Sequence, residues 1–134
     1  MRALEDAGVS AEQIGTIRVG VNTWMRFPNL TTQLQDAIGA SNASAADISA
    51  GCSGFIYAIK NAYKKLIIKK SVYSHDIITL MVKVDGLSHV TDWTDRQTCV
   101  LLGDGAGAVV MKQVDSGGIL ATHTHTNKNY DNYL

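Results

Sequence analysis

The sequence is poor in the features that mark several common classes of protein. Its 134 residues include only two cysteines, one proline, and twelve basic side chains balanced by twelve acidic ones. Two cysteines without a secretory signal do not suggest a disulfide scaffold. A zero formal charge gives no electrostatic reason to expect nucleic acid or an anionic membrane as a partner. These shortages favour a globular protein in a reducing compartment, and we expect it in the cytoplasm.

Long apolar runs are also missing. The longest, 77–82, is interrupted by Thr79 and is too short to cross a bilayer. The N-terminus reads MRALEDAGVSAEQ, whose acids and lack of an apolar run differ from a signal peptide. Hydrophobic residues make up 46% of the chain, which is enough for one buried core. We therefore expect no membrane span and one partial domain over 1–134, truncated at both ends, because the chain opens inside a helix and stops in a loop.

Apolar periodicity predicts helices and strands in alternation, followed by hairpins. Helices are predicted at 2–7, 30–38 and from Phe55 to Ile67, and strands at 16–21, 45–48, 76–82, 99–102, 108–114 and 119–126. The glycine-rich segment 103–107 is predicted to be a tight loop between two of these strands. This order favours an α/β fold with a mixed sheet packed by helices.

Cys52 stands between a short predicted strand and the longest predicted helix, within the tight turn 51–54. Backbone N–H groups and the positive end of the helix dipole favour a thiolate at such a position. The flanking glycines let the backbone turn sharply, as in other strand–turn–helix sites that expose a nucleophile. A free cysteine is also commonly a buried structural residue. The residues alone therefore leave open whether Cys52 is a nucleophile, although GCSG differs from the G-x-S-x-G pattern of serine hydrolases.

Arg96 and Phe27 are two further candidates whose roles the residues alone leave open. Arg96 can bind a phosphate group, but it can equally pair with Asp92 or Asp95 nearby in the chain. Phe27 lies in a loop beside the only proline, either as an exposed hydrophobic anchor or as a lid packed on its own core.

Two other motifs favour structural explanations. The segment 103–108 fits G-x-G-x-x-A, but β-branched residues follow where a dinucleotide site needs a helix. His123 and His125 face the same side of a predicted strand, yet no further ligands lie at a suitable spacing. We therefore expect neither a dinucleotide nor a metal site.

Taken together, the motifs resemble a known family. The segment 47–55 (DISAGCSGF) resembles the active-cysteine segment of β-ketoacyl-acyl-carrier-protein synthase III. The segments 92–98 (DWTDRQT), 102–108 (LGDGAGA) and 118–123 (GILATH) resemble later family segments in the same order, and 6–8 (DAG) and 26–28 (RFP) resemble earlier ones. The resemblance covers nearly the whole chain and favours the nucleophile interpretation of Cys52.

The resemblance implies a thiolase-like, layered α/β/α fold and a homodimer. It implies that Cys52 takes an acyl group, commonly acetyl, from acyl-coenzyme A, and that the acyl enzyme condenses with malonyl-acyl-carrier protein. Arg96 would lie at the coenzyme A entrance, Phe27 would line or gate the acyl pocket by reaching across the dimer, and the loop 103–107 would support the site. Coenzyme A enters as part of the substrate, so no resident cofactor is expected.

The resemblance also shows departures. The family's catalytic histidine and asparagine belong to its second half, and His123, His125 and Asn127 do not lie in the matching motifs. Arg18 lies in a strand that is normally apolar. Two alternatives therefore stay open beside the enzyme: a non-catalytic assembly module that needs a partner chain, and a polyketide-type or quinolone-type condensing enzyme.

Overall fold

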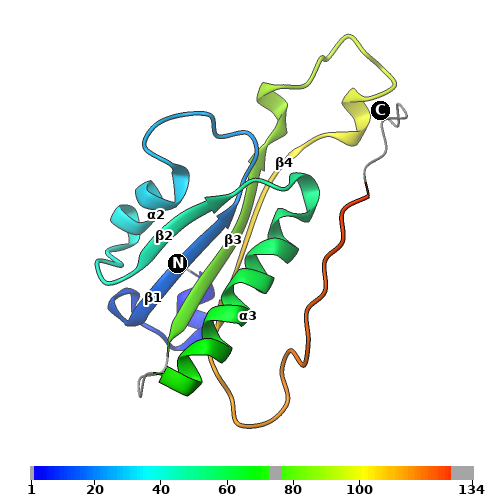
Figure 1. The fold of residues 1–134 in the computed structure, drawn as a ribbon. Helices are drawn as coiled ribbons and strands as arrows, with labels where there is room; N and C mark the ends of the chain where they lie inside the picture. Colours follow the sequence, from blue (N-terminus) through cyan, green and yellow to red (C-terminus); the bar gives the residue numbers. More distant parts are fainter. Residues whose placement is uncertain (1, 73–76, 128–134) are drawn as a thin grey trace.

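The computed structural model describes residues 2–72 and 77–127 (Figure 1). In chain order, its helices and strands are α1 (Arg2–Ala7), β1 (Ile14–Gly20), α2 (Leu30–Ile38), β2 (Ser44–Ile48), α3 (Gly54–Val72), β3 (Ile78–Gly86) and β4 (Asp104–Met111). The predicted strand start at Asp76 and the last part of the predicted domain, 128–134, lie outside the described residues. Within the described ranges, no helix has both the length and the apolar character needed to cross a bilayer.

The four strands form one mixed sheet in the order β2-β1-β3-β4. Strands β1, β2 and β3 are mutually parallel, and β4 pairs antiparallel with β3. Helix α3 covers one face of the sheet, whereas α1 and α2 lie on the other (Figure 1). The predicted layered α/β/α arrangement with a mixed sheet is confirmed.

Successive side chains of the central strands point to opposite faces of the sheet and pack into two separate hydrophobic cores. Ile17 of β1 and Leu80 of β3 are fully buried on the side of α1 and α2. Met81 points to the opposite face, where it packs against Ala58 and Ala62 of α3. Small side chains on that face of α3 allow the helix to approach the sheet closely, which fixes the helix that follows Cys52.

Arg18 is buried in β1 on the α3 side, with 7% of its surface exposed. Its Nε donates to Oδ1 of Asn61 in α3 at 3.0 Å, and its Nη1 donates to the carbonyls of Ile17 (2.7 Å) and Ser44 (3.0 Å). These hydrogen bonds satisfy Nε and Nη1 of the buried guanidinium. The departure at Arg18 therefore adds a polar link between β1 and α3.

Two predictions about the later strands are wrong. Residues 99–101 form a short 3-10 turn, and Gly105 and Gly107 lie within β4, paired with Asp85 and Lys83 of β3. Glycine is tolerated there because β4 needs only its backbone to pair, and its first six residues are exposed. The expected supporting loop is thus an edge strand.

The predicted last strand, 119–126, is also wrong. This segment runs alongside α3 (Figure 1) without forming strand pairs among the described residues. Side chains of α3 hold it instead: the Tyr63 hydroxyl donates to the Leu120 carbonyl at 2.7 Å, and Lys60 donates to the Thr124 hydroxyl. Side-chain hydrogen bonds from α3 thus take the place of the predicted strand pairing.

Asp47 of β2 caps the N-terminus of α2. Its carboxylate accepts the backbone N–H of Leu30 at 3.0 Å and that of Thr31 at 2.8 Å, as well as the Thr31 hydroxyl. We expect Asp47→Ala to lower the free energy of unfolding by about 1–3 kcal/mol, because it strips these donors of their acceptor. Urea denaturation measures the loss. Asp36→Ala, on the exposed side of the same helix, is the control and should leave the midpoint unchanged; equal midpoints for both variants would contradict the capping role.

Candidate active site

The fold gathers the three predicted site residues at one end of the sheet. Because β1, β2 and β3 are parallel, their carboxyl ends lie at the same edge, where ligands bind in many open α/β sheets. Phe27 lies in the loop after β1, Cys52 in the turn after β2, and Arg96 in the loop after β3. These three connections leave the sheet in the upper part of Figure 1. The topology therefore places the segments that carry these residues together, and their individual roles stay predictions.

Cys52 lies in the 3-10 turn Gly51–Ser53, directly before α3, and is exposed to solvent. Gly51 adopts φ +56°, in the left-handed region that glycine occupies without strain. The Ser53 hydroxyl donates to the Ala50 carbonyl at 2.6 Å and closes the turn. The structure thus presents an exposed thiol at the start of a 19-residue helix, as the strand–turn–helix pattern predicts.

The start of α3 lies directly on the backbone of β1. An added Cβ on Gly20 would lie 2.8 Å from the carbonyl carbon of Gly54 and 3.1 Å from the backbone N of Phe55. Only a residue without a side chain at position 20 allows this approach. Contact between two backbones therefore fixes the height of the cysteine turn above the sheet.

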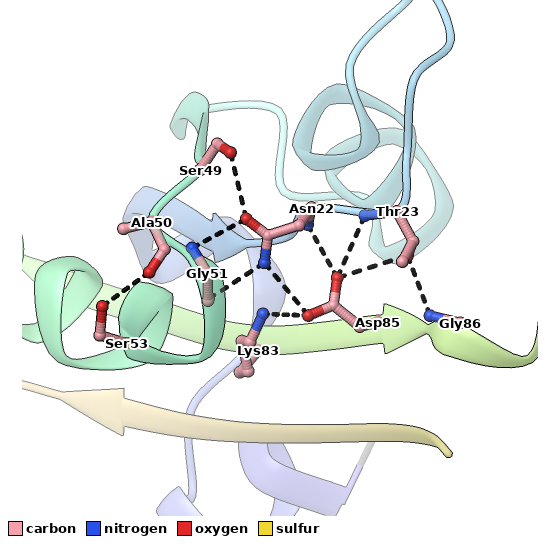
Figure 2. Close-up of polar contacts among 9 residues, drawn as sticks. All are labelled: Asn22, Thr23, Ser49, Ala50, Gly51, Ser53, Lys83, Asp85 and Gly86. Atoms are coloured by element: carbon pink, nitrogen blue, oxygen red, sulfur yellow. Dashed lines mark hydrogen bonds and ion pairs between the residues drawn. The ribbon is translucent and has the colours of Figure 1, made fainter. Parts of the chain in front are cut away.

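Asn22, the second residue after β1, forms hydrogen bonds to the turn that carries Cys52 (Figure 2). Its Oδ1 accepts the backbone N–H of Gly51 at 3.0 Å and the Ser49 hydroxyl at 3.1 Å. Its Nδ2 donates to the Gly51 carbonyl at 3.0 Å and to Oδ2 of Asp85 at 3.3 Å. The peptide groups on both sides of Gly51, including the one that leads into Cys52, are thus bonded to one carboxamide.

Asp85, near the end of β3, anchors this arrangement. Its Oδ1 accepts the backbone N–H groups of Asn22 at 2.8 Å and Thr23 at 3.2 Å, and Lys83 forms an ion pair with its Oδ2. Figure 2 shows the carboxylate between the loop after β1 and the end of β3. Asp85 therefore ties Asn22 and Thr23 of that loop to β3.

The bonding of Asp85 predicts a specific pH dependence of stability. Partial burial alone would raise the pKa of Asp85, but the hydrogen bonds from Lys83 and from the Asn22 and Thr23 backbone outweigh it and lower the pKa. Its stabilisation is therefore complete above the unfolded-state pKa of about 4 and is lost as the pH falls below that value. We expect Asp85→Asn to be less stable than the parent at pH 7 and to lose less further stability between about pH 5 and pH 3.

Urea denaturation at both pH values measures this difference. Asp92, Asp95 and Asp104 also have lowered pKa values, because of hydrogen bonds from Thr94, Thr98 and Ser88 respectively, so some acid sensitivity must remain in both proteins. Parallel pH profiles for the parent and Asp85→Asn would show that Asp85 carries no linked stability.

Arg96 does not pair with either neighbouring carboxylate. Asp92 accepts the Thr94 backbone N–H at 2.9 Å, and Asp95 accepts the backbone N–H of Gln97 at 2.9 Å. Both acids are thus used in local turns, and within the described part of the chain no ion pair of Arg96 is present. The guanidinium is exposed, which favours the phosphate-binding alternative over the local salt bridge.

Phe27 is fully exposed, at 100% of its reference surface, so the alternative of a lid packed on its own core is wrong. The neighbouring loop residues contact one another instead. The Arg26 guanidinium lies 5.6 Å from the centre of the Trp24 ring, and the Trp24 Nε1–H donates to the Pro28 carbonyl at 3.2 Å. The loop thus presents Phe27 outwards, as an anchor for another surface requires.

Asn22, Asp85 and Lys83 were not predicted from the sequence. One available signal was the acid at position 85, which follows an apolar strand pattern and lies near the end of β3. The histidines at 123 and 125 are exposed, and among residues 2–72 and 77–127 no three His, Cys, Asp or Glu side chains come together as metal ligands would.

Known proteins are similar to this chain over most of its length. The model of the family described as 3-oxoacyl-[acyl-carrier-protein (ACP)] synthase III matches residues 46–128, which include Cys52 and Arg96. A beta-ketoacyl-[acyl-carrier-protein] synthase III from Xanthomonas euvesicatoria is 45% identical over 127 residues, or 93% of this chain and 37% of its own length. One from Geobacillus kaustophilus is 49% identical over 122 residues, covering 90% of this chain and 38% of its own length.

Solved structures show the same relationship in three dimensions. The crystal structure of 3-oxoacyl-[acyl-carrier-protein] synthase III from Aquifex aeolicus has a TM-score of 0.73 and 39% identity, covering 85% of this chain and 36% of that one. The priming β-ketosynthase of the R1128 polyketide pathway has a TM-score of 0.77 and 36% identity, covering 87% and 34%. The predicted thiolase-like fold is confirmed, and the chain spans little more than a third of the length of these proteins. The family match over residues 46–128, with this agreement in sequence and structure, shows that the chain belongs to the 3-oxoacyl-[acyl-carrier-protein] synthase III family.

Proposed function

We propose that this chain supplies the acyl-accepting cysteine of a 3-oxoacyl-acyl-carrier-protein synthase III. The Cys52 thiolate attacks the carbonyl of an acyl-coenzyme A thioester, acetyl in the first instance. A new carbon–sulfur bond forms to Cys52, the bond to coenzyme A breaks, and the departing thiolate takes up a proton. One thioester replaces another, so the exchange needs little driving force.

The position of Cys52 carries this proposal. The thiol is exposed, stands at the N-terminal end of α3, and lies at the edge of the sheet where the loops bearing Phe27 and Arg96 also end. Backbone N–H groups at a helix N-terminus and the helix dipole stabilise the oxyanion that forms on attack. Structural cysteines are usually buried, as Cys99 is here.

The acyl group then condenses with malonyl-acyl-carrier protein, with loss of carbon dioxide and formation of a 3-oxoacyl product. The backbone N–H of Cys52 is one proposed donor to the acyl oxygen, and the remaining donors come from the second half of the family fold. We assign Arg96 to the coenzyme A phosphates and Phe27 to the acyl pocket of a second copy in a homodimer. The exposed Arg96 guanidinium and the outward Phe27 side chain support these assignments. The reduced Cys52 thiol fits a cytoplasmic setting.

Acetyl uptake tests the first step directly. The chain is incubated with acetyl-coenzyme A, its intact mass is measured, and peptide mapping locates any added group. We expect one acetyl group per chain, on the peptide that contains Cys52, removable by hydroxylamine as a thioester is. A folded sample that gains no acetyl group would overturn the proposal for this chain and favour the non-catalytic assembly module.

A polyketide-type priming enzyme is the second candidate, and its support is the similarity to the R1128 priming β-ketosynthase. Competition between acetyl-coenzyme A and hexanoyl-coenzyme A measures the donor preference of Cys52. Preferential acetyl labelling supports the acetyl donor proposed above, whereas preferential hexanoyl labelling counts against it.

A further inference from the structure

We infer that Asn22 is a positioning residue for Cys52, acting through the peptide groups on either side of Gly51. This inference rests on the proposed function, because it concerns the acyl-accepting thiol. It starts from the fact that a single side chain is bonded to both the N–H and the C=O of the residue before the nucleophile (Figure 2).

An asparagine carboxamide offers two donor hydrogens and two acceptor lone pairs, and Asn22 uses all four. The two hydrogens go to the Gly51 carbonyl and to Asp85, and the two lone pairs receive the Gly51 N–H and the Ser49 hydroxyl. Aspartate has the same shape but lacks the two donors. It would therefore face the Gly51 carbonyl and the Asp85 carboxylate with a negative oxygen.

Asp85 sets the orientation of this carboxamide. Its Oδ2 accepts from Nδ2 of Asn22, so the amide nitrogen, rather than the oxygen, must face the carboxylate. Its Oδ1 accepts the Asn22 backbone N–H, which fixes the main chain that bears the carboxamide. Lys83 pairs with the same carboxylate and keeps it ionised. Asp85 and Lys83 thus act on the turn indirectly, by orienting Asn22.

The hydrogen bonds between Asn22 and Gly51 also affect the position of Cys52. Gly51 is in a left-handed conformation that glycine can readily leave, so its own backbone preference does not hold the turn. The Gly51 carbonyl belongs to the peptide group whose nitrogen is the Cys52 N–H, so its bond to Asn22 sets the direction of that donor. A displacement of about 1 Å at a reacting group can cost about a hundredfold in rate.

The first test compares Asn22→Asp with Asn42→Asp. Asn42 is an exposed asparagine whose Nδ2 donates to the Glu12 carbonyl at 3.0 Å, away from the cysteine turn. We expect the acetylation rate of Cys52 to fall at least tenfold in Asn22→Asp and to remain at the parent value in Asn42→Asp. An unchanged rate in Asn22→Asp would overturn the inference.

A swapped pair separates positioning from general stability. The double variant Asn22→Asp with Asp85→Asn restores one carboxylate and one carboxamide in contact, but it leaves no donor at position 22 for the Gly51 carbonyl. We expect the double variant to regain most of the melting temperature lost in Asn22→Asp, while the acetylation rate stays low. Recovery of the rate together with the melting temperature would show that Asn22 only stabilises the fold.

Alkylation of Cys52 by iodoacetamide, followed by peptide mapping, keeps the inference testable if the parent chain takes up no acetyl group. That failure would count against the proposed function, whereas the alkylation rates still report on the turn. In the parent we expect the alkylation rate of Cys52 to differ from the rate in the same chain unfolded in urea. In Asn22→Asp and in the swapped pair we expect an alkylation rate close to the value for the unfolded chain. Parent-like alkylation in both variants would overturn the inference independently.

Discussion

Replacement of Cys52 by alanine is expected to abolish acetyl uptake completely, which is the largest single effect that the structure predicts. No other group at the carboxyl edge of β1, β2 and β3 combines a thiol with exposure and a helix N-terminus among the described residues. Cys52→Ala removes the nucleophile itself, so no residual transfer to this position remains. Intact mass after incubation with acetyl-coenzyme A checks this, with circular dichroism confirming that the variant is folded.

Cys99→Ala is the matched control. Cys99 is the second free cysteine, is buried with 6% of its surface exposed, and lies in the 3-10 turn before β4. Its replacement should leave acetyl uptake at the parent level. Acetyl labelling that survives in Cys52→Ala and disappears in Cys99→Ala would show that Cys99 is the acyl acceptor and would refute the proposed mechanism.

Gly20→Ala is expected to cause the second large effect, through packing rather than chemistry. The new Cβ would lie 2.8 Å from the carbonyl carbon of Gly54, and backbone on both sides leaves no flexible side chain to yield. The start of α3 must therefore move away from β1. We expect a loss of about 1–3 kcal/mol in the free energy of unfolding, the usual cost of overpacking a core, together with slower acetylation of Cys52 because its turn moves with the helix.

Gly15→Ala lies in the same strand and provides the comparison. A Cβ on Gly15 would lie 3.4 Å from Cγ2 of Ile77, the end of a side chain, and 3.9 Å from the carbonyl of Ile78. Small adjustments accommodate it, so the urea midpoint and acetylation rate should stay near the parent values. If Gly20→Ala behaved like Gly15→Ala in both measurements, the close backbone contact would not be what fixes the cysteine turn.

The sequence by itself determined the α/β fold class, the tight turn that carries Cys52, and the positions of α1, α2, α3 and the parallel strands. Apolar residues at helical spacing after position 54 and the β-branched runs at 16–21 and 76–82 are local patterns, so they predict α3, β1 and β3 without tertiary information. The turn around Cys52 is likewise encoded in adjacent glycines. These features depend on neighbours in the chain, which is why the residues alone were enough to locate the candidate active site.

Only the tertiary structure decided the features that depend on residues far apart in the chain. The glycine-rich segment forms strand β4 because β3 provides an antiparallel partner for its backbone. Residues 119–126 form no strand, and side chains of α3 hydrogen-bond to this segment instead. The hydrogen bonds that join Asn22, Gly51 and Asp85 connect three segments 29 and 63 residues apart. No local pattern predicts such contacts, because they exist only after parallel pairing brings the ends of β1, β2 and β3 to one edge of the sheet.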